Sequence, residues 1–284
     1  MFESYWNSIL VLMGINILWA WSLYIPLSAG VLSCGQPGFA SIGAYSSALA
    51  TLAGWPFPAS LTLGGILALI FGIALGISSL RLRGFGVAIS TLAFAEMVRI
   101  FFTNVKFFGG AQGIYNIPLF TNLSLVWGIV AIFFFFFLRL SRSRLGRALD
   151  AVREDELAAE TMGINSARIK IFTMGVSGLL AGLGGGLYAH FLCYLEPPAF
   201  GFGLLIQMCV NTIFGGSLTY LGPFFGTVFL SSLSEYLRFF VEWRLLIYGL
   251  LIVLLLILRP QGIITRELVA FSHRMILSFP SKKK

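Results

Sequence analysis

The chain has 284 residues, of which 58% are hydrophobic and 11% are charged, and its formal net charge is +8. Soluble domains carry about 25% charged residues, so this composition excludes a soluble globular protein and indicates that a lipid bilayer surrounds most of the chain. The basic residues flank apolar segments and do not cover a polar domain, which excludes nucleic-acid binding. We therefore expect an all-α polytopic membrane protein with a single transmembrane domain over residues 1–284.

Apolar segments that could form membrane helices follow one another along the chain. A full crossing needs about 20 residues, and several segments are shorter, so we expect about 8–10 transmembrane helices, some of them broken or re-entrant. The N-terminus lacks a positively charged region before its apolar stretch, so we expect the first segment to be retained as a span. The segments are 8–28, 31–53, 58–79, 85–103, 123–138, 171–192, 204–218, 223–240 and 245–258.

Polar and helix-breaking residues interrupt the second apolar segment near its start. Ser33, Gly35, Gln36 and Gly38 surround Pro37. A broken helix is tolerated at membrane depth where protein or a wet cavity satisfies the released backbone groups, and its N-terminus can attract a substrate carboxylate. The same residues also fit a kinked packing element, and the sequence leaves both interpretations open.

The fourth apolar segment contains two opposite charges. Glu96 and Arg99 are three residues apart, so they can pair on one helix. Such a pair either lines a transport pathway or gate, or holds two helices in register. The candidate residues of a translocation path or gate are Ser33, Gln36, Phe39, Thr91, Glu96, Arg99 and Asn211.

Positive charge predicts which parts of the chain face the cytoplasm. Residues 1–80 contain no Lys or Arg, and later clusters of these residues flank the spans, which normally places them on the cytoplasmic side. The expected cytoplasmic parts are Arg81 with Arg83, a loop at about 139–170 and the C-terminal tail at about 259–284; residues 104–122 and 196–198 then face outside, with Lys106, Arg238 and Arg244 as exceptions to the rule.

Residues 139–170 hold 12 of the 30 charged side chains of the chain. Good helix formers predict one short helix from Gly146 to about Met162, Gly163 is suited to end it, and Asn165 or Ser166 can cap the next helix. Its apolar stripe would be Leu145, Ala148, Leu149, Val152, Ala159 and Met162.

Four acids lie on or near the polar face of this predicted helix: Glu154, Asp155, Glu156 and Glu160. An anionic membrane leaflet would repel them, so they favour docking into a cationic groove of another protein. A solvated amphipathic loop is the alternative interpretation.

Motifs of catalysis are absent from the sequence. It has no GxxxxGK[ST] phosphate-binding loop, no H-E-x-x-H motif and no clustered carboxylates. His190 and His273 are solitary, and Cys34, Cys193 and Cys209 lie in apolar surroundings without metal-ligand spacing. We therefore expect no enzymatic activity, no metal site and no cofactor in this chain.

The charged loop and several other segments together resemble one family, the ABC importer permeases with an EAA-type cytoplasmic loop. The resemblance is strongest to the permeases of branched-chain amino acid importers, on the M-type subunit side. It covers roughly residues 28–264, with two departures: the family often has His where Gln36 stands, and the glycine-rich turn reads Gly215-Gly216-Ser217-Leu218-Thr219-Tyr220-Leu221-Gly222-Pro223. The matching elements are Gly146-Arg147-Ala148, Ala151–Glu156, Ala158–Asn165, Leu32–Gln36 with Phe39 and Gly43-Ala44-Tyr45, Arg81–Gly84 with Thr91–Glu96, Phe214-Gly215-Gly216 with Gly222-Pro223, and Arg259–Gly262.

This resemblance implies a subunit of a larger machine in the bacterial inner membrane. Its partners would be a homologous second permease, two cytoplasmic ATP-binding subunits that hold ATP and Mg, a periplasmic substrate-binding protein and membrane lipid. The substrate would be Leu, Ile or Val; urea or short amides are the alternative, and a stand-alone secondary transporter is the alternative of a different class. The residues that would couple to the ATP-binding subunits are Gly146, Arg147, Arg153, Glu154, Asp155, Glu156, Ala158, Ala159 and Gly163.

Overall fold

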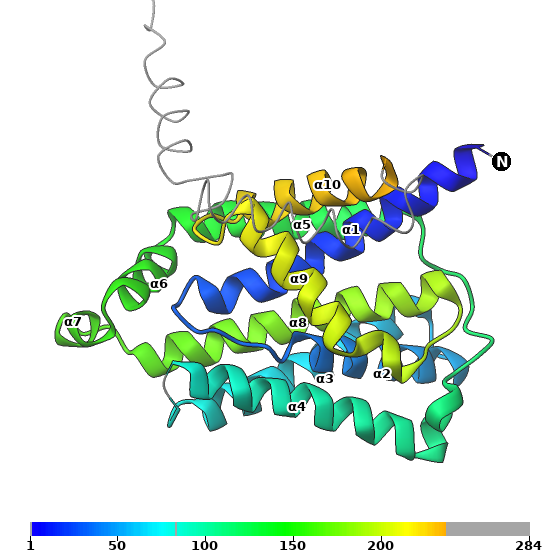
Figure 1. Cartoon of the computed structure of the whole chain (residues 1–284), viewed down its shortest axis with the longest axis horizontal. Helices are drawn as coiled ribbons and strands as arrows, with labels where there is room; N and C mark the ends of the chain where they lie inside the picture. The colour runs from blue at the N-terminus through cyan, green and yellow to red at the C-terminus, as the bar shows by residue number, and fades with distance from the viewer. Residues whose placement is uncertain (1, 83, 237–284) are drawn as a thin grey trace, which may run out of the picture. The chain divides into compact units, whose positions relative to one another are not determined.

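A computed structural model of the chain describes residues 2–82 and 84–236, with side chains from Tyr5 onward. Residues up to Cys209 form one compact unit and those from Val210 onward another. The described residues form helices joined by turns and loops (Figure 1), and they contain no β-strand beyond one isolated bridge. The helices are α1 (Phe2–Leu27), α2 (Gln36–Leu52), α3 (Phe57–Ser79), α4 (Phe85–Asn104), α5 (Leu123–Arg142), α6 (Arg144–Glu154), α7 (Glu156–Thr161), α8 (Ser166–Leu192), α9 (Phe202–Gly215) and α10 (Leu221–Tyr236), with 3-10 turns η1 (Lys106–Phe108), η2 (Gly110–Gln112) and η3 (Pro197–Phe200).

The predicted all-helical membrane architecture is confirmed. Within the described residues, 6 stretches are long and apolar enough to cross a membrane: Tyr5–Leu27, Phe57–Ser79, Phe85–Asn104, Leu123–Arg142, Ser166–Leu192 and Pro197–Gly215. The second and eighth predicted segments form α2 and α10, which have 17 and 16 residues and are short for a full crossing. Segment 245–258, the tail 259–284, His273, Arg83, Arg238 and Arg244 lie outside the described residues, so the expected count of about 8–10 spans stays a prediction.

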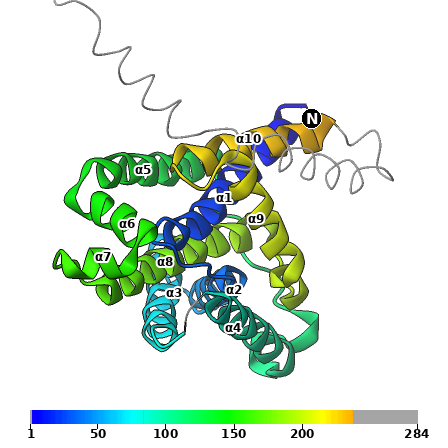
Figure 2. The ribbon, with the colours of Figure 1, turned by 60° about the vertical axis from the view of Figure 1, so that its left-hand side comes forward.

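Helices α2, α3 and α8 form the centre of the first unit, and they touch through glycine. A Cβ atom on Gly43 of α2 would lie 2.2 Å from the carbonyl oxygen of Gly182 on α8. A Cβ atom on Gly178 would lie 2.2 Å from the carbonyl oxygen of Ala68 on α3. Figure 2 shows these three helices beside one another, with α1 along α8. Such contacts require small residues, and they form the rigid centre of the unit.

The connections of the first unit gather at two ends of the helices. Helices α6 and α7 lie at the left end in Figure 1, and the connections after α4 and α8 lie at the right end. At the right end, the amide of Ile114 donates a hydrogen bond to the carbonyl of Leu195 at 2.9 Å, and the reverse bond is 3.0 Å. The two stretches predicted to face outside therefore share one end, opposite the charged loop.

The second unit is described by its helix α10 and the end of α9. The carbonyl oxygen of Asn211 would lie 2.5 Å from a Cβ atom on Gly226, so α10 crosses the end of α9 at backbone contact. The rings of Phe214 and Phe229 stack with their centroids 5.3 Å apart. Small residues at Gly215 and Gly226 therefore allow the two helices to meet closely.

Candidate functional site

The turn that joins α5 to α6 is built around Ser143 and Gly146. The hydroxyl of Ser143 accepts a hydrogen bond from the amide of Gly146 at 3.1 Å and so caps α6. A Cβ atom on Gly146 would lie 2.2 Å from the carbonyl oxygen of Leu140. The chain can therefore turn sharply out of α5 because this position is glycine.

The single helix predicted from Gly146 to about Met162 was wrong, because α6 ends at Glu154 and α7 begins at Glu156. Asp155 between them has an extended backbone, with φ −153° and ψ 110°, and its carboxylate accepts a hydrogen bond from the amide of Ala158 at 3.0 Å. An Asp side chain in this role competes with helical hydrogen bonding, which explains the break.

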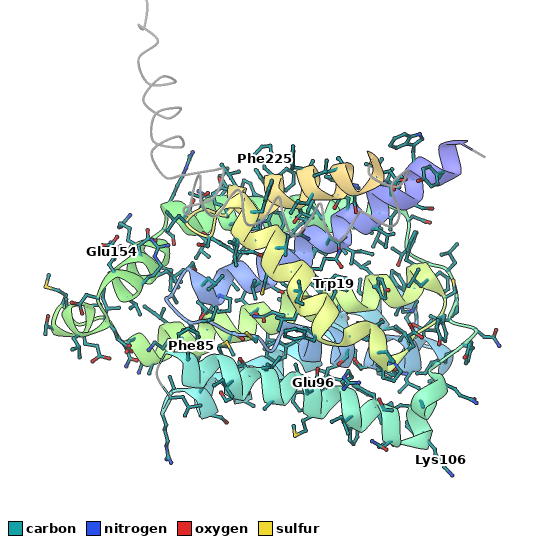
Figure 3. All side chains as sticks on the ribbon, in the orientation of Figure 1. Trp19, Phe85, Glu96, Lys106, Glu154 and Phe225 are labelled. Carbon is teal, nitrogen blue, oxygen red and sulfur yellow. The ribbon has the colours of Figure 1, made fainter. Side chains whose placement is uncertain are left out.

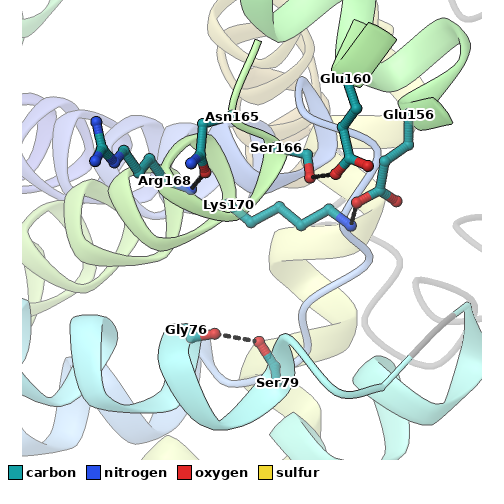
Figure 4. A network of polar contacts seen from close by, with 8 residues as sticks. All are labelled: Gly76, Ser79, Glu156, Glu160, Asn165, Ser166, Arg168 and Lys170. Carbon is teal, nitrogen blue, oxygen red and sulfur yellow. Dashed lines mark hydrogen bonds and ion pairs between the residues drawn. The ribbon is translucent and has the colours of Figure 1, made fainter. Parts of the chain in front are cut away.

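Two side-chain contacts tie α7 to the first turns of α8 (Figure 4). The ammonium of Lys170 lies 2.5 Å from Oε1 of Glu156, and the hydroxyl of Ser166 donates to Oε1 of Glu160. The predicted cap of α8 is Asn165, whose side chain accepts from the amide of Arg168 at 3.0 Å. We call these contacts, with the Asp155 cap, the α7 clamp.

The predicted end of the charged helix at Gly163 is confirmed. Its φ of +83° lies in the left-handed region that favours glycine, and its amide donates to the carbonyl of Glu160 at 3.0 Å. The apolar stripe was only partly correct, since Leu149, Val152 and Ala159 are buried whereas Leu145 is 45% exposed and Met162 is 83% exposed.

The residues predicted to couple to ATP-binding subunits divide into two groups. The exposed group could meet another protein, and it consists of Arg147, Glu154, Asp155, Ala158 and Gly163. The remaining residues support the loop itself: Gly146 and Ala159 are buried, Glu156 binds Lys170, and the side chain of Arg153 is only 17% exposed. Figure 3 shows Glu154 at the outer edge of this end.

The predicted break in the second apolar segment is confirmed at Gln36, where α2 begins. Residues 31–35 before it are not helical. The amide of Cys34 donates to Oγ1 of Thr91 on α4 at 2.8 Å. Nε2 of Gln36 donates to Oγ of Ser177 on α8 at 3.3 Å, while Oε1 of Gln36 is buried without a hydrogen-bond partner. The structure therefore brings Ser33, Gln36 and Thr91 together in the interior, with Ser33 1% exposed and the other two fully buried.

The remaining pathway candidates lie in other surroundings. Phe39 is buried against Phe94, with ring centroids 5.4 Å apart. Arg99 Nη2 lies 2.7 Å from Glu96 Oε2, so the predicted pair forms, and both side chains are about one third exposed. Glu96 lies midway along α4 in Figure 3. Asn211 belongs to the second unit and is buried there, 6% exposed.

Tyrosine side chains pack together at the opposite end of the first unit. The rings of Tyr115 and Tyr194 are 4.7 Å apart, and the phenol of Tyr194 donates to Glu196 Oε2 at 3.1 Å. Hydrogen bonding with Tyr115, desolvation and the nearby carboxylate of Glu196 raise the pKa of Tyr194 to about 12. Its phenol therefore stays neutral near pH 7.

Sequence reasoning missed several partners of the candidate residues. Lys170 and Ser177 stand 14 and 141 positions from the residues they contact, and no local pattern links them. His190 is buried, with Nδ1 2.8 Å from the carbonyl oxygen of Gly186 and Nε2 2.9 Å from Oγ1 of Thr51. In the part of the chain that the structure describes, no three His, Cys, Asp or Glu residues are placed to hold a metal ion.

Comparisons with known proteins place the chain in a family. A family model described as "Branched-chain amino acid transport system / permease component" matches residues 5–256. The high-affinity branched-chain amino acid transport system permease protein LivM of Escherichia coli is 33% identical over 83% of this chain and 64% of its own length. The probable LivM protein of Methanocaldococcus jannaschii is 24% identical, over 79% of this chain and 71% of its own length.

Another relative is the nucleoside ABC transporter permease protein NupC of Lactococcus lactis, 26% identical over 57% of this chain and 59% of its own length. The match to the Escherichia coli protein spans less than two thirds of that protein's length. No solved structure matches the chain. Because the family model covers most of the sequence, the chain belongs to the family of permease components of branched-chain amino acid transport systems.

Proposed function

We propose that this chain is the transmembrane permease subunit of an ATP-driven, binding-protein-dependent ABC importer that moves branched-chain amino acids across a bacterial inner membrane. It acts with a homologous second permease, two cytoplasmic ATP-binding subunits and a periplasmic binding protein. The charged loop and the C-terminal tail face the cytoplasm. ATP and Mg bind to the partner subunits, and this chain is not itself an enzyme.

The observation that carries this proposal is the charged loop at one end of an apolar helix bundle. The α7 clamp fixes this loop to α8, which runs on into the core of the unit. A force applied to a fixed loop moves the helices to which it is attached, whereas a mobile loop would absorb it. The ATP-binding subunits bind the surface formed by the exposed residues Arg147, Glu154 and Asp155.

The interior polar residues support a transport role over a purely structural one. Gln36 begins a helix inside the bundle, and its buried Oε1 atom has no hydrogen-bond partner. A buried polar atom without a partner costs free energy, and a functional role is one reason why a protein keeps such an atom. We propose that Ser33, Gln36 and Thr91 line the path in another state of the transport cycle, with the Glu96–Arg99 pair nearby on α4.

The test is reconstitution of the complete importer in proteoliposomes. We expect ATP-dependent uptake of leucine, isoleucine and valine that requires the binding protein, the second permease and both ATP-binding subunits. Uptake without ATP-binding subunits would instead show a secondary transporter. Urea, a short amide and a nucleoside belong in the substrate panel, because one relative of this chain is named for nucleosides; preferred uptake of any of these would replace the branched-chain assignment.

A variant of Gln36 tests the path inside this complex. Gln36→Leu keeps the volume of the side chain nearly unchanged but removes the hydrogen bond to Ser177. We expect uptake to fall by about fivefold or more, since a polar contact is worth about 1 kcal/mol, while assembly with the ATP-binding subunits stays intact. Uptake at the wild-type rate would assign Gln36 to packing alone.

A further inference from the structure

The α6 helix lies close to the connection between α1 and α2 at Gly30. Gly30 has φ +74°, and a Cβ atom built on it would lie 3.3 Å from Cα and 3.6 Å from Cγ of Arg153. The turn that holds Gly30 is closed by hydrogen bonds from the amides of Gly30 and Val31 to the carbonyls of Leu27 and Pro26, both 3.0 Å. The charged loop is therefore in backbone contact with an ordered turn that is distant in sequence.

The side chain of Arg153 is largely buried, and it lies beside the turn that holds Gly30. Its side chain is 17% exposed, and its Nη2 atom lies 3.9 Å from Oδ1 of Asp150. The second guanidinium nitrogen, Nη1, is buried without a hydrogen-bond partner. A buried charged donor without an acceptor costs free energy, so Nη1 of Arg153 is held in an unfavourable position on α6.

The turn at Gly30 continues directly into the extended segment that precedes α2. In this segment the amide of Cys34 donates to Thr91 on α4, and Gly35 lies beside Leu75 on α3, whose Cδ2 would be 3.2 Å from an added Cβ atom. The next residue is Gln36, which contacts Ser177 on α8. Residues 28–35, which we call the transmission strap, thus join α6 to the polar interior (Figure 1).

We propose that the transmission strap carries movement of α6 to the start of α2, and that Arg153 is the residue that positions it. When the ATP-binding subunits displace α6, Arg153 moves Gly30, and the strap changes the position of Gln36 relative to Thr91 and Ser177. Arg153 acts within the permease and is not part of the docking surface. This inference rests on the proposed function, because it requires motor subunits that displace α6.

Cys34 is a native reporter of the strap, since it is partly exposed and lies four residues beyond Gly30. The test uses an importer in which Cys193→Ser and Cys209→Ala leave Cys34 as the free cysteine of the described part of this chain. The rate at which N-ethylmaleimide labels Cys34 is measured without nucleotide and after ATP with vanadate has trapped the ATP-binding subunits. We expect trapping to change the labelling rate of Cys34 by about threefold or more, because two positions of the strap differ in exposure. In the Arg153→Gln variant of the same importer we expect no change on trapping.

Measurements of uptake and of complex assembly distinguish a residue that transmits movement from a residue that binds the ATP-binding subunits. Arg153→Gln should lower uptake by about tenfold, within the range of typical coupling energies, while the ATP-binding subunits copurify at the wild-type ratio and still hydrolyse ATP. Arg144→Gln is the matched control, an exposed arginine of the same helix outside the docking residues, and should transport normally. Loss of the ATP-binding subunits from the Arg153→Gln complex would overturn the inference, because Arg153 would then belong to the docking surface.

Gly30→Ala tests the other side of the same contact. The added methyl group meets the backbone of Arg153, and we expect the same loss of uptake with normal assembly. Gly54→Ala is its control, because Gly54 has φ +89° but no atom within 4 Å of an added Cβ, so it introduces backbone strain without the contact. Equal effects of the two variants would overturn the inference.

The wild-type importer distinguishes failure of this inference from failure of the proposed function. A wild-type complex without ATP-dependent uptake would defeat the proposed function. A wild-type complex with normal uptake, but with labelling of Cys34 that does not respond to trapping, would defeat only the role of the strap.

Discussion

The ammonium of Lys170 at the start of α8 lies 2.5 Å from the carboxylate of Glu156 on α7. Their side chains are 23% and 41% exposed, and partly exposed ion pairs of this kind contribute about 0–1 kcal/mol to stability. The pair therefore matters for position more than for stability. It holds the short exposed helix of the charged loop against a helix most of whose residues are buried in the bundle.

Exchange of the two charges tests whether the role of Glu156 is to pair with Lys170 or to bind an ATP-binding subunit. Glu156→Lys places two cations together, loosens α7 and should lower uptake by about fivefold. The double variant Glu156→Lys with Lys170→Glu restores an ion pair of opposite direction and should recover uptake to within about twofold. Uptake is measured in proteoliposomes with the complete importer. No recovery in the double variant would indicate that Glu156 binds an ATP-binding subunit directly.

Asp155 offers a separate test of the cap on α7. Asp155→Ala removes the acceptor for the amide of Ala158 and should cost α7 about 1 kcal/mol. Asp155→Asn removes the charge but keeps a good capping side chain, so it should resemble the wild type. Hydrogen exchange of residues 156–162 measures the effect, and we expect faster exchange in the alanine variant alone. Equal acceleration in both variants would mean that the charge of Asp155, and not its cap, orders the helix.

The elements with a strong local signal could be predicted from the sequence. Gly163 ends a helix because it adopts a left-handed conformation, Asn165 caps the next helix, and Pro37 marks the break before α2. The spacing of Glu96 and Arg99 correctly predicted their ion pair. Each of these depends on residues within a few positions of one another, so the sequence order alone carries the information.

Contacts between distant residues could not be predicted in this way. The contact of Gly30 with Arg153 and the hydrogen bond of Gln36 with Ser177 join helices whose relative rotation no local pattern determines. The break at Asp155 was missed for a different reason. The surrounding Ala, Leu and Glu residues favour a helix, and the capping bond to Ala158 outweighs that preference.

The glycine contacts between α2 and α8 should contribute strongly to the stability of the fold. Gly43→Ala places a methyl group 2.2 Å from the carbonyl oxygen of Gly182, and backbone atoms cannot move aside without separating the helices. We expect a loss of more than about 2 kcal/mol, or a fall in Tm of about 5 °C or more in detergent. Gly128→Ala is the control, because no atom lies within 4 Å of its added Cβ; a similar fall in Tm there would refute the packing argument.

The Glu96–Arg99 pair can be assigned to structure or to transport by comparing single and double variants. Arg99→Met leaves a carboxylate unpaired on a helix that is apolar enough to cross the membrane, so the level of protein in the membrane should fall. Glu96→Leu combined with Arg99→Met removes both charges and should restore that level. Because both side chains remain about one third exposed, we expect them to face water or the second permease. Uptake by the double variant should therefore stay reduced by about fivefold. Normal uptake at a normal membrane level would instead show that the pair only fixes the position of α4.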